Sequence, residues 1–213
     1  MKVGTDGVLL GAWTPVGDAA RILDAGTGTG IISLILAQRC EGNAEITAID
    51  IDSPSIEEAQ DNFGTSPWSA SLHAERISLQ EFAEKAENEA RFDLIVSNPP
   101  FFVASLKAPD SRRSCARHTD TLDFGELIES SLKILTPEGR LAVIFPVEEG
   151  MGFTAEAESA GLHLMRMYRV STKAGKPAKR LLMEFSREAT APLFGELALD
   201  SEEFHRLTSE FYL

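Results

Sequence analysis

Apolar runs of strand length alternate with amphipathic stretches of helix length along the whole chain. The strand-like runs are short and strongly apolar, which is typical of strands buried on both faces of a parallel sheet. Seven such runs are predicted, at residues 21–24, 45–49, 71–78, 92–97, 140–145, 162–170 and 180–185. The helix-length stretches lie at residues 31–39, 54–62, 79–90, 122–135 and 147–160.

This alternation predicts an α/β fold with a doubly wound, mostly parallel, seven-stranded sheet of the Rossmann-like kind. The last two runs follow one another without a helix between them. We therefore expect them to form an antiparallel hairpin at the carboxyl-terminal edge of the sheet. Because no linker divides the sequence, residues 1–213 are expected to form one domain.

The composition adds limits on the class of protein. The chain has 213 residues, of which 43% are hydrophobic and 25% charged, so a disordered protein is excluded. No apolar run is long enough to span a membrane, and the first residues lack the apolar centre of a secretion signal. Cys40 and Cys115 are the only cysteines, which excludes a disulfide scaffold and favours a cytoplasmic location.

The net charge of −13 argues against a nucleic-acid partner until its distribution is considered. Residues 105–118 and 165–187 hold eleven of the 20 Lys and Arg residues but only two of the 33 acidic ones. These two segments together carry +9, and the rest of the chain carries −22. Two interpretations stay open: solvated loops on an acidic protein, or a local positive surface for a polyanion.

A glycine cluster lies between the first predicted strand and the first predicted helix. It consists of Asp24, Gly26, Gly28 and Gly30, and Asp50 ends the next strand. Glycines here allow a tight turn and close approach of a ligand, and a carboxylate at the end of the second strand can accept ribose hydroxyls. The spacing differs from the dinucleotide fingerprint, and the carboxylate of Asp24 would repel a pyrophosphate. The pattern favours S-adenosylmethionine, which has a sulfonium and an ammonium group but no phosphate, and it resembles that of class I methyltransferases.

The tetrapeptide Asn98-Pro99-Pro100-Phe101 follows the apolar run 92–97. Ligands of doubly wound sheets gather outside the carboxyl ends of the strands, so this segment is expected to face the cofactor. The Asn98 side-chain oxygen and the Pro99 carbonyl are suited to accept the two N–H groups of a planar amine and so direct its lone pair. Phe101 is suited to stack on the planar acceptor.

The histidines and Cys115 give weaker indications of a functional role. His118 follows the first basic segment, and either a phosphate contact or a solvent-exposed position suits it. The remaining histidines lack ligand spacing for zinc, so no metal is expected. Cys115 has no identifiable general base.

The Asn-Pro-Pro-aromatic signature resembles that of amino-group methyltransferases. Residues 2–13, Lys-Val-Gly-Thr-Asp-Gly-Val-Leu-Leu-Gly-Ala-Trp, are similar to a segment of the bacterial tRNA(Val) adenine-N6 methyltransferase family, which methylates the adenine beside the anticodon. Residues 117–119, 179–180 and 210–213 are similar to that family too. The family usually has a further segment before residues 2–13, and its absence leaves any role of that segment open.

The resemblance implies a class I methyltransferase that transfers a methyl group from S-adenosylmethionine to N6 of an adenine in tRNA, expected to be adenine 37 of tRNA(Val). The expected catalytic residues are Asn98, Pro99, Pro100 and Phe101. The expected cofactor-binding residues are Thr5, Asp6, Asp24, Gly26, Gly28, Gly30, Asp50, Ser78 and Asn98. The expected RNA-binding residues are Arg112, Arg113, Arg117, His118, Lys173, Lys176, Lys179 and Arg180. The expected partner is tRNA, without a membrane or a metal, and the expected state is a monomer.

Three other functions remain open. Glutamine-N5 methyltransferases of peptide release factors also carry Asn-Pro-Pro with an aromatic, but a peptide substrate gives the basic segments no role. Guanine-N2 methyltransferases of ribosomal RNA often duplicate the domain, for which 213 residues leave no room. An inactive factor that binds the cofactor and RNA would have no reason to keep Asn98.

Overall fold

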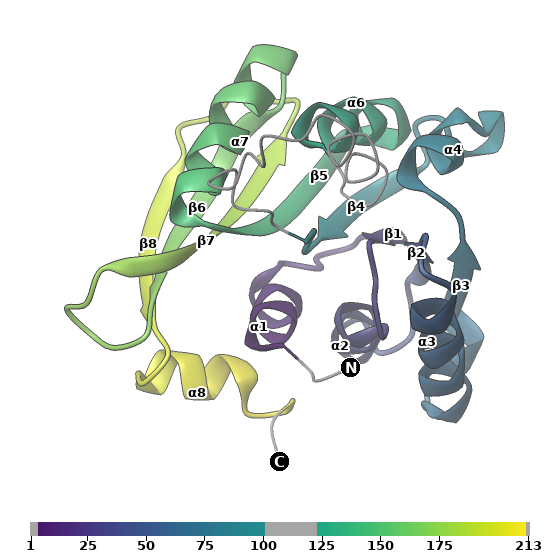
Figure 1. Ribbon diagram of the computed structural model, residues 1–213, viewed down its shortest axis with the longest axis horizontal. Coiled ribbons are helices and arrows are strands. Elements are labelled where there is room, and N and C mark those ends of the chain that lie inside the picture. Colours follow the sequence, from purple (N-terminus) through teal and green to yellow (C-terminus); the bar gives the residue numbers. More distant parts are fainter. Residues whose placement is uncertain (1–3, 101–122, 212–213) are drawn as a thin grey trace, which may run out of the picture.

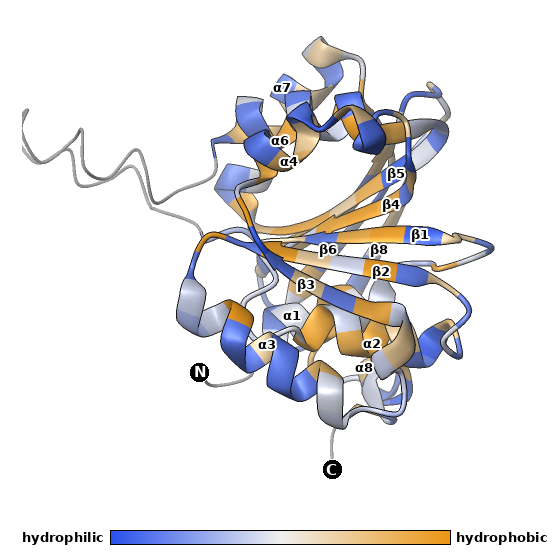
Figure 2. Cartoon of the chain, turned by 90° about the vertical axis from the view of Figure 1, so that its right-hand side faces the viewer, coloured by the Kyte–Doolittle hydropathy of each residue, from blue (hydrophilic) through white to orange (hydrophobic). Residues whose placement is uncertain are grey.

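The computed structural model describes residues 4–100 and 123–211. Its strands form one eight-stranded sheet in the order β3-β2-β1-β4-β5-β7-β6-β8. Helices cover both faces of the sheet, with α4, α6 and α7 on one face and α1, α2, α3 and α8 on the other (Figures 1 and 2). The predicted α/β, doubly wound architecture is therefore confirmed.

The strands span β1 (Arg21–Ala25), β2 (Glu45–Asp50), β3 (Leu72–Arg76), β4 (Phe92–Ser97), β5 (Leu135–Pro146), β6 (His163–Ser171), β7 (Ala178–Ser186) and β8 (Leu193–Ala198). The first five are parallel to one another. Strand β7 is antiparallel to both β5 and β6, and β8 is parallel to β6. The carboxyl ends of all strands except β7 therefore lie at one edge, which we call the carboxyl edge.

The helices span α1 (Thr5–Trp13), α2 (Ile31–Arg39), α3 (Ser53–Thr65), α4 (Leu79–Glu84), α6 (Phe124–Ile134), α7 (Val147–Ala160) and α8 (Glu202–Thr208). Short 3₁₀ turns occupy Ser69–Ser71 and Ala86–Asn88. The helix predicted at residues 147–160 begins and ends at these same residues. The helix predicted at 79–90 ends at Glu84 instead, because the backbone of Lys85 is extended, with ψ of 120°.

The central strands are apolar on both faces because a helical layer covers each face. Successive residues of β4 alternate between the two layers: Leu94 and Val96 pack on the α1, α2 side, whereas Ile95 packs on the α6, α7 side. All three side chains are fully buried. This two-sided burial explains the continuous apolar runs in the sequence.

The prediction of seven strands with a hairpin at the edge is wrong in two respects. An eighth strand, β8, pairs with β6 and forms the edge, and the hairpin strand β7 lies inside the sheet. Strand β8 escaped prediction because it is a half-exposed edge strand that follows Pro192, contains Gly195 and shows no alternation of apolar and polar residues. Leu193 and Phe194 are 67% and 70% exposed.

Helix α1 was also missed by the pattern of apolar residues. Its residues from Gly7 to Trp13 are all buried, so the helix has no polar face to reveal its period. It lies close against α2 because it presents glycines there. A Cβ at Gly7 would lie 3.2 Å from Ile31 Cγ2, and one at Gly11 would lie 3.0 Å from Ile35 Cγ2.

A buried carboxylate ties α1 to the carboxyl-terminal strands. Glu184 of β7 is 2% exposed and accepts from Arg140 Nη1 at 2.6 Å and from Arg166 Nε at 2.7 Å. The Arg166 guanidinium also lies 3.8 Å from the ring centroid of Trp13, and its Nη2 donates to the Trp13 carbonyl. One negative charge thus holds two arginines that reach from α1 to β5 and β6.

Candidate functional site

The predicted cofactor and catalytic residues meet at the carboxyl edge. Strand β1 pairs with β2 on one side and with β4 on the other, with Ala25 in register with both Ile49 and Ser97. The residues that follow these positions are the glycine loop, Asp50 and Asn98. Three segments far apart in the sequence therefore leave the sheet side by side, where ligands of doubly wound folds bind.

The glycine loop (residues 24–30) is fixed by backbone bonds and by left-handed glycines. The Gly26 and Thr27 amides donate to the Ile49 carbonyl at 2.9 and 3.0 Å, and Gly26, Gly28 and Gly30 have φ of 76°, 56° and 81°. A Cβ at Gly30 would lie 2.4 Å from Phe63 Cε1, so this glycine serves close packing on α3. Nothing lies within 4 Å of the Cβ position at Gly26. Gly26 thus leaves open space for a ligand against the backbone.

Asp24 lies buried beneath this loop. Its Oδ2 accepts from Thr27 Oγ1 and Ser33 Oγ, both at 2.7 Å, and from the Ser33 amide at 3.2 Å. Its Oδ1 is buried with no hydrogen-bond partner in the part of the chain that is described. Burial raises the pKa of Asp24 from 3.8 to about 6, and the three hydrogen bonds only partly oppose this shift. A cationic ligand group would satisfy both the orphan oxygen and the charge.

The raised pKa predicts a pH-dependent stability for the ligand-free protein. The folded chain holds the Asp24 proton more tightly than the unfolded chain does. The resulting contribution to the free energy of unfolding is fully present below pH 4 and is lost as the pH rises through about 6. The full shift corresponds to about 3 kcal/mol. Asp24→Asn should therefore gain stability relative to the native protein between pH 4 and 7, as measured by urea unfolding. If the difference in the free energy of unfolding between the two proteins stayed constant over this pH range, the raised pKa of Asp24 would be contradicted.

Asp50 is half-buried at the end of β2, and its two oxygens hold the backbone around it. Oδ2 accepts from the Gly28 amide at 2.9 Å, and Oδ1 accepts from the Asp52 amide at 3.0 Å. Asp52 in turn caps α3 by accepting from the Ser55 amide. Each Asp50 oxygen retains a lone pair for a ligand hydroxyl.

Two residues at this site escaped the sequence analysis. Ile51 follows Asp50 directly and is 46% exposed, which places an apolar side chain beside the predicted ribose position. Asn62 of α3 donates through Nδ2 to the Thr29 carbonyl at 2.9 Å and so supports the glycine loop from outside. An apolar residue directly after the strand-ending carboxylate was the available signal for Ile51. The contact of Asn62 is long-range and has no local signal.

Ser78 has a structural partner. Its hydroxyl donates to Glu81 Oε2 at 2.8 Å and accepts from the Glu81 amide at 3.2 Å, which makes a capping box at the start of α4. This cap explains the residue without a ligand. The cofactor-binding role of Ser78 stays a prediction.

The segment with Asn98 is anchored at the strand end. Ser97 is fully buried, and its hydroxyl donates to the Ala25 carbonyl at 2.7 Å, which joins the end of β4 to the end of β1. Asn98 is half-buried, Pro99 is buried and Pro100 is exposed. The predicted site residues Phe101, Arg112, Arg113, Arg117 and His118 lie outside the described residues.

Thr5 and Asp6 begin α1, and they too lie near the carboxyl edge. Asp6 Oδ2 accepts from Arg180 Nε at 2.7 Å, and Arg180 is in register with Pro146 at the end of β5. Of the predicted RNA-binding cations, Arg180 therefore has its charge matched by a carboxylate. Lys173, Lys176 and Lys179 are exposed around the β6–β7 turn at the same edge.

Two features are absent from the described residues. No helix among them is long and apolar enough to cross a membrane. Residues 4–100 and 123–211 also contain no cluster of three or more His, Cys, Asp or Glu side chains that could hold a metal ion.

Comparison with known proteins identifies the family. The Methyltransferase small domain family matches residues 7–154. The tRNA1(Val) (adenine(37)-N6)-methyltransferase of Phocaeicola vulgatus is 46% identical over 100% of this chain and 91% of its own length. The enzyme of the same name from Tolumonas auensis is 43% identical over 100% of this chain and 90% of its own length. The chain belongs to the tRNA1(Val) (adenine(37)-N6)-methyltransferase family.

Solved structures of other methyltransferases have the same fold as this chain. A predicted O-methyltransferase from Agrobacterium tumefaciens has a TM-score of 0.71 at 19% identity, with 96% of each chain covered. The glycopeptide N-methyltransferase MtfA, complexed with sinefungin, has a TM-score of 0.61 at 10% identity, with 86% of this chain and 95% of MtfA covered. These structures confirm the predicted fold class. The family match and the relatives confirm the methyltransferase class of enzyme and the dependence on S-adenosylmethionine.

Proposed function

We propose that this chain transfers a methyl group from S-adenosylmethionine to the exocyclic N6 of an adenine in tRNA, at position 37 of tRNA(Val). The observation that carries the proposal is the Ser97–Ala25 bond, which holds the exit of the Asn98-Pro99-Pro100 segment beside the glycine loop. Relatives of 43–46% identity over the whole chain, named for this reaction, support the choice of substrate.

The residues at the carboxyl edge fit S-adenosylmethionine. Asp50 would accept the ribose hydroxyls, and the orphan Oδ1 of Asp24 suits the region that receives the cationic amino-acid end. The open space at Gly26 allows the ligand to lie on the backbone. When bound, the cofactor supplies an electrophilic methyl group on its sulfonium.

Asn98 and Pro99 would prepare the adenine amine. This amine is a poor nucleophile because its lone pair is delocalised into the ring. The Asn98 side-chain oxygen and the Pro99 carbonyl would each accept one amine N–H and so localise the lone pair toward the methyl group. Burial of Pro99 and the Ser97 anchor restrict the movement of both acceptors, which favours a preorganised geometry.

Removal of the Asp50 carboxylate should weaken cofactor binding. We expect Asp50→Ala to lower the affinity for S-adenosylmethionine by about 10- to 100-fold, as for the loss of hydrogen bonds to a charged group. Asp61→Ala is the matched control, because Asp61 is an exposed carboxylate on α3. Isothermal calorimetry measures both affinities. Equal affinities for the native protein and Asp50→Ala would exclude the ribose role.

The basic β6–β7 turn would hold the RNA backbone. The variant K173A/K176A/K179A should bind tRNA with a weaker dependence on salt. The slope of log affinity against log salt concentration should become less steep by about 0.7 for each phosphate contact that is lost. The cofactor affinity should not change. Arg21→Ala, at the opposite end of the sheet, is the control. Identical salt slopes for the native protein and the triple variant would show that these lysines form only a solvated surface.

The reaction itself is tested with labelled S-adenosylmethionine and total tRNA, followed by mass analysis of the nucleosides. The proposal expects N6-methyladenosine. Labelled guanosine, or labelled glutamine after incubation with a release factor instead of tRNA, would support the corresponding rival. Binding of cofactor and RNA with no transfer would support the inactive factor.

Three further expectations belong to this proposal. We propose that the chain acts as one catalytic domain over residues 1–213, as a monomer, in the cytoplasm where tRNA is processed.

Three of the basic side chains of residues 165–187 have partners within the protein: Arg166 binds Glu184, Arg180 binds Asp6, and Arg187 donates to the Leu132 carbonyl. The exposed cations that remain in this segment are Arg169, Lys173, Lys176 and Lys179.

A further inference from the structure

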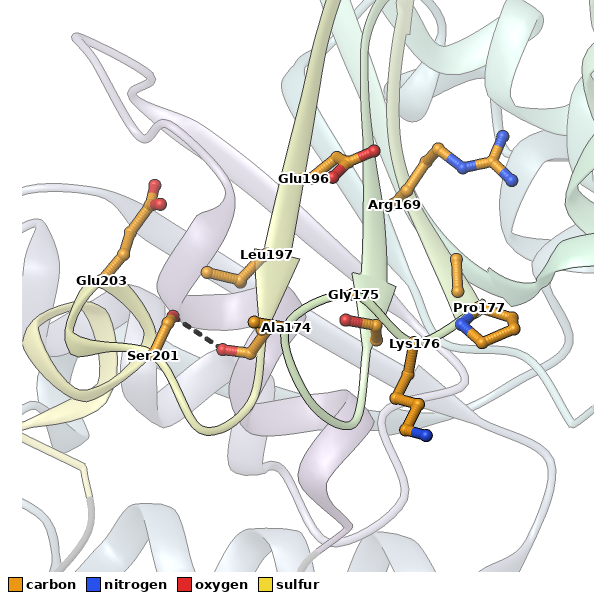
Figure 3. A pocket seen from close by; sticks show the side chains of 12 residues that line it. Arg169, Ala174, Gly175, Lys176, Pro177, Glu196, Leu197, Ser201 and Glu203 are labelled. Atoms are coloured by element: carbon orange, nitrogen blue, oxygen red, sulfur yellow. Dashed lines mark hydrogen bonds between the residues drawn. The ribbon is translucent and has the colours of Figure 1, made fainter.

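A groove lined by both charged and apolar side chains opens at the carboxyl edge, beyond the proposed catalytic residues. It has a volume of about 590 Å³ and lies between the end of β6, the β6–β7 turn, β8 and the start of α8 (Figure 3). Arg169 and Glu196 are in register on neighbouring strands, Lys176 and Pro177 come from the turn, and Glu203 comes from α8 on the other side. None of the residues proposed to bind the cofactor or to act on the amine lines it, whereas Lys176 belongs to the basic turn proposed to hold the RNA backbone.

The walls of the groove are joined by hydrogen bonds that do not need a ligand. The Ala174 amide donates to Asp200 Oδ1 at 3.1 Å, and the Leu199 amide donates to the Ser171 carbonyl at 2.9 Å. The turn is closed by a bond from the Lys176 amide to the Lys173 carbonyl at 3.1 Å. The walls of the groove are thus connected to one another and preformed.

The charges of the groove restrict the chemistry of its occupant. Within residues 4–100 and 123–211, no ion pair forms between the two cations Arg169 and Lys176 and the two carboxylates Glu196 and Glu203. The cations attract a phosphate, whereas the carboxylates repel a phosphate and accept hydrogen bonds from donor groups. A ribonucleotide has both features, because it carries a phosphate and a donating 2′-hydroxyl. The exposed Pro177 ring adds an apolar surface for a base.

The position of the groove suits the same RNA strand as the target base. Strand β6 is three places from β4 in the sheet, which corresponds to about 14 Å at a spacing of about 4.8 Å per strand. Both the groove and Asn98 open at the carboxyl edge, and a few nucleotides of extended RNA span this distance. The exposed lysines of the turn lie beside the groove.

We infer that this groove binds a ribonucleotide that flanks the target adenine in the RNA substrate, with Lys176 and Arg169 at the phosphate and Glu196 at the 2′-hydroxyl. The inference rests on the proposed function and extends it. It makes the groove a second contact that distinguishes RNA from DNA and fixes the strand relative to Asn98.

The test uses an anticodon stem-loop RNA that contains the target adenine, with a single 2′-deoxy substitution moved through the loop. For the native protein, one position a few nucleotides from the target should bind about tenfold more weakly when deoxy, equal to about 1.4 kcal/mol. Glu196→Ala should lose this sensitivity at that position alone, and Lys176→Ala should weaken binding at all positions. Glu188→Ala, an exposed carboxylate after β7, is the matched control and should retain the native profile.

The outcomes separate the groove from the proposed reaction. If the native protein methylates the unsubstituted RNA but shows a flat 2′-deoxy profile, the groove assignment is wrong and the proposed function stands. If the sensitive position persists unchanged in Glu196→Ala, the assignment of Glu196 is wrong. If the RNA is neither bound nor methylated, both proposals are wrong.

Discussion

Asn98→Ala should slow methyl transfer by roughly two to three orders of magnitude and leave the affinity for S-adenosylmethionine almost unchanged. The reason is that the side-chain oxygen of Asn98 would act on the amine of the acceptor, whereas the cofactor would be held by the glycine loop and Asp50. Loss of one preorganised polar group at a reacting centre typically has this magnitude. Single-turnover kinetics with saturating cofactor would measure the transfer step, and calorimetry would measure cofactor affinity.

Asn62→Ala gives the opposite pattern and serves as the control. This variant removes the bond to the Thr29 carbonyl behind the glycine loop, so the cofactor affinity should fall before the rate of the transfer step does. Near-normal turnover in Asn98→Ala would show that the amide does not polarise the amine. Equal losses of affinity and rate in both variants would show that Asn98 acts by holding the loop.

Glu184→Ala should destabilise the protein by about 3–5 kcal/mol, because it leaves two arginines without their shared carboxylate. The Arg140 and Arg166 side chains are only 20% and 21% exposed, so water screens their mutual repulsion weakly. Urea unfolding at neutral pH measures the change in the free energy of unfolding.

Glu188→Ala is the matched control for this prediction, since Glu188 is an exposed carboxylate four residues further along the chain. It should change the free energy of unfolding by less than about 0.5 kcal/mol. A small effect for Glu184→Ala would mean that the two guanidinium groups find enough solvent or other partners without it. In that case the link from α1 to β5 and β6 would depend on apolar packing.

The sequence was informative where the local pattern follows from the burial of an element. Strands β1, β2 and β4 are covered on both faces, so their apolar runs revealed them, and helix α7 was predicted at both ends. Elements with unusual environments were missed. Helix α1 is buried on all sides, α8 is only seven residues long, and β8 is an exposed edge. Two walls of the groove, β8 and α8, are elements of this second kind, and its presence was therefore not predictable from the pattern of residues.

For the candidate site too, features with a local sequence pattern were predictable and long-range contacts were not. The glycines and the two carboxylates were evident from the sequence because tight turns and strand ends require particular residue types at fixed spacing. The bonds Ser97–Ala25, Asn62–Thr29 and Arg180–Asp6 join residues far apart in the chain, and no local pattern encodes them. The orphan oxygen of Asp24 likewise depends on the burial of the whole loop.

The order of strands in the sheet has a consequence for folding. Strands β6, β7 and β8 are consecutive in the chain, so their pairing closes short loops. The contact between Ser97 and Ala25 closes a loop of 72 residues, at a greater cost in chain entropy. Contacts that are local in sequence form more readily during folding. We therefore expect the turn that carries the lysines to gain its shape before the junction of β1 and β4 completes the cofactor site, so that refolding followed at the hairpin precedes the recovery of cofactor binding.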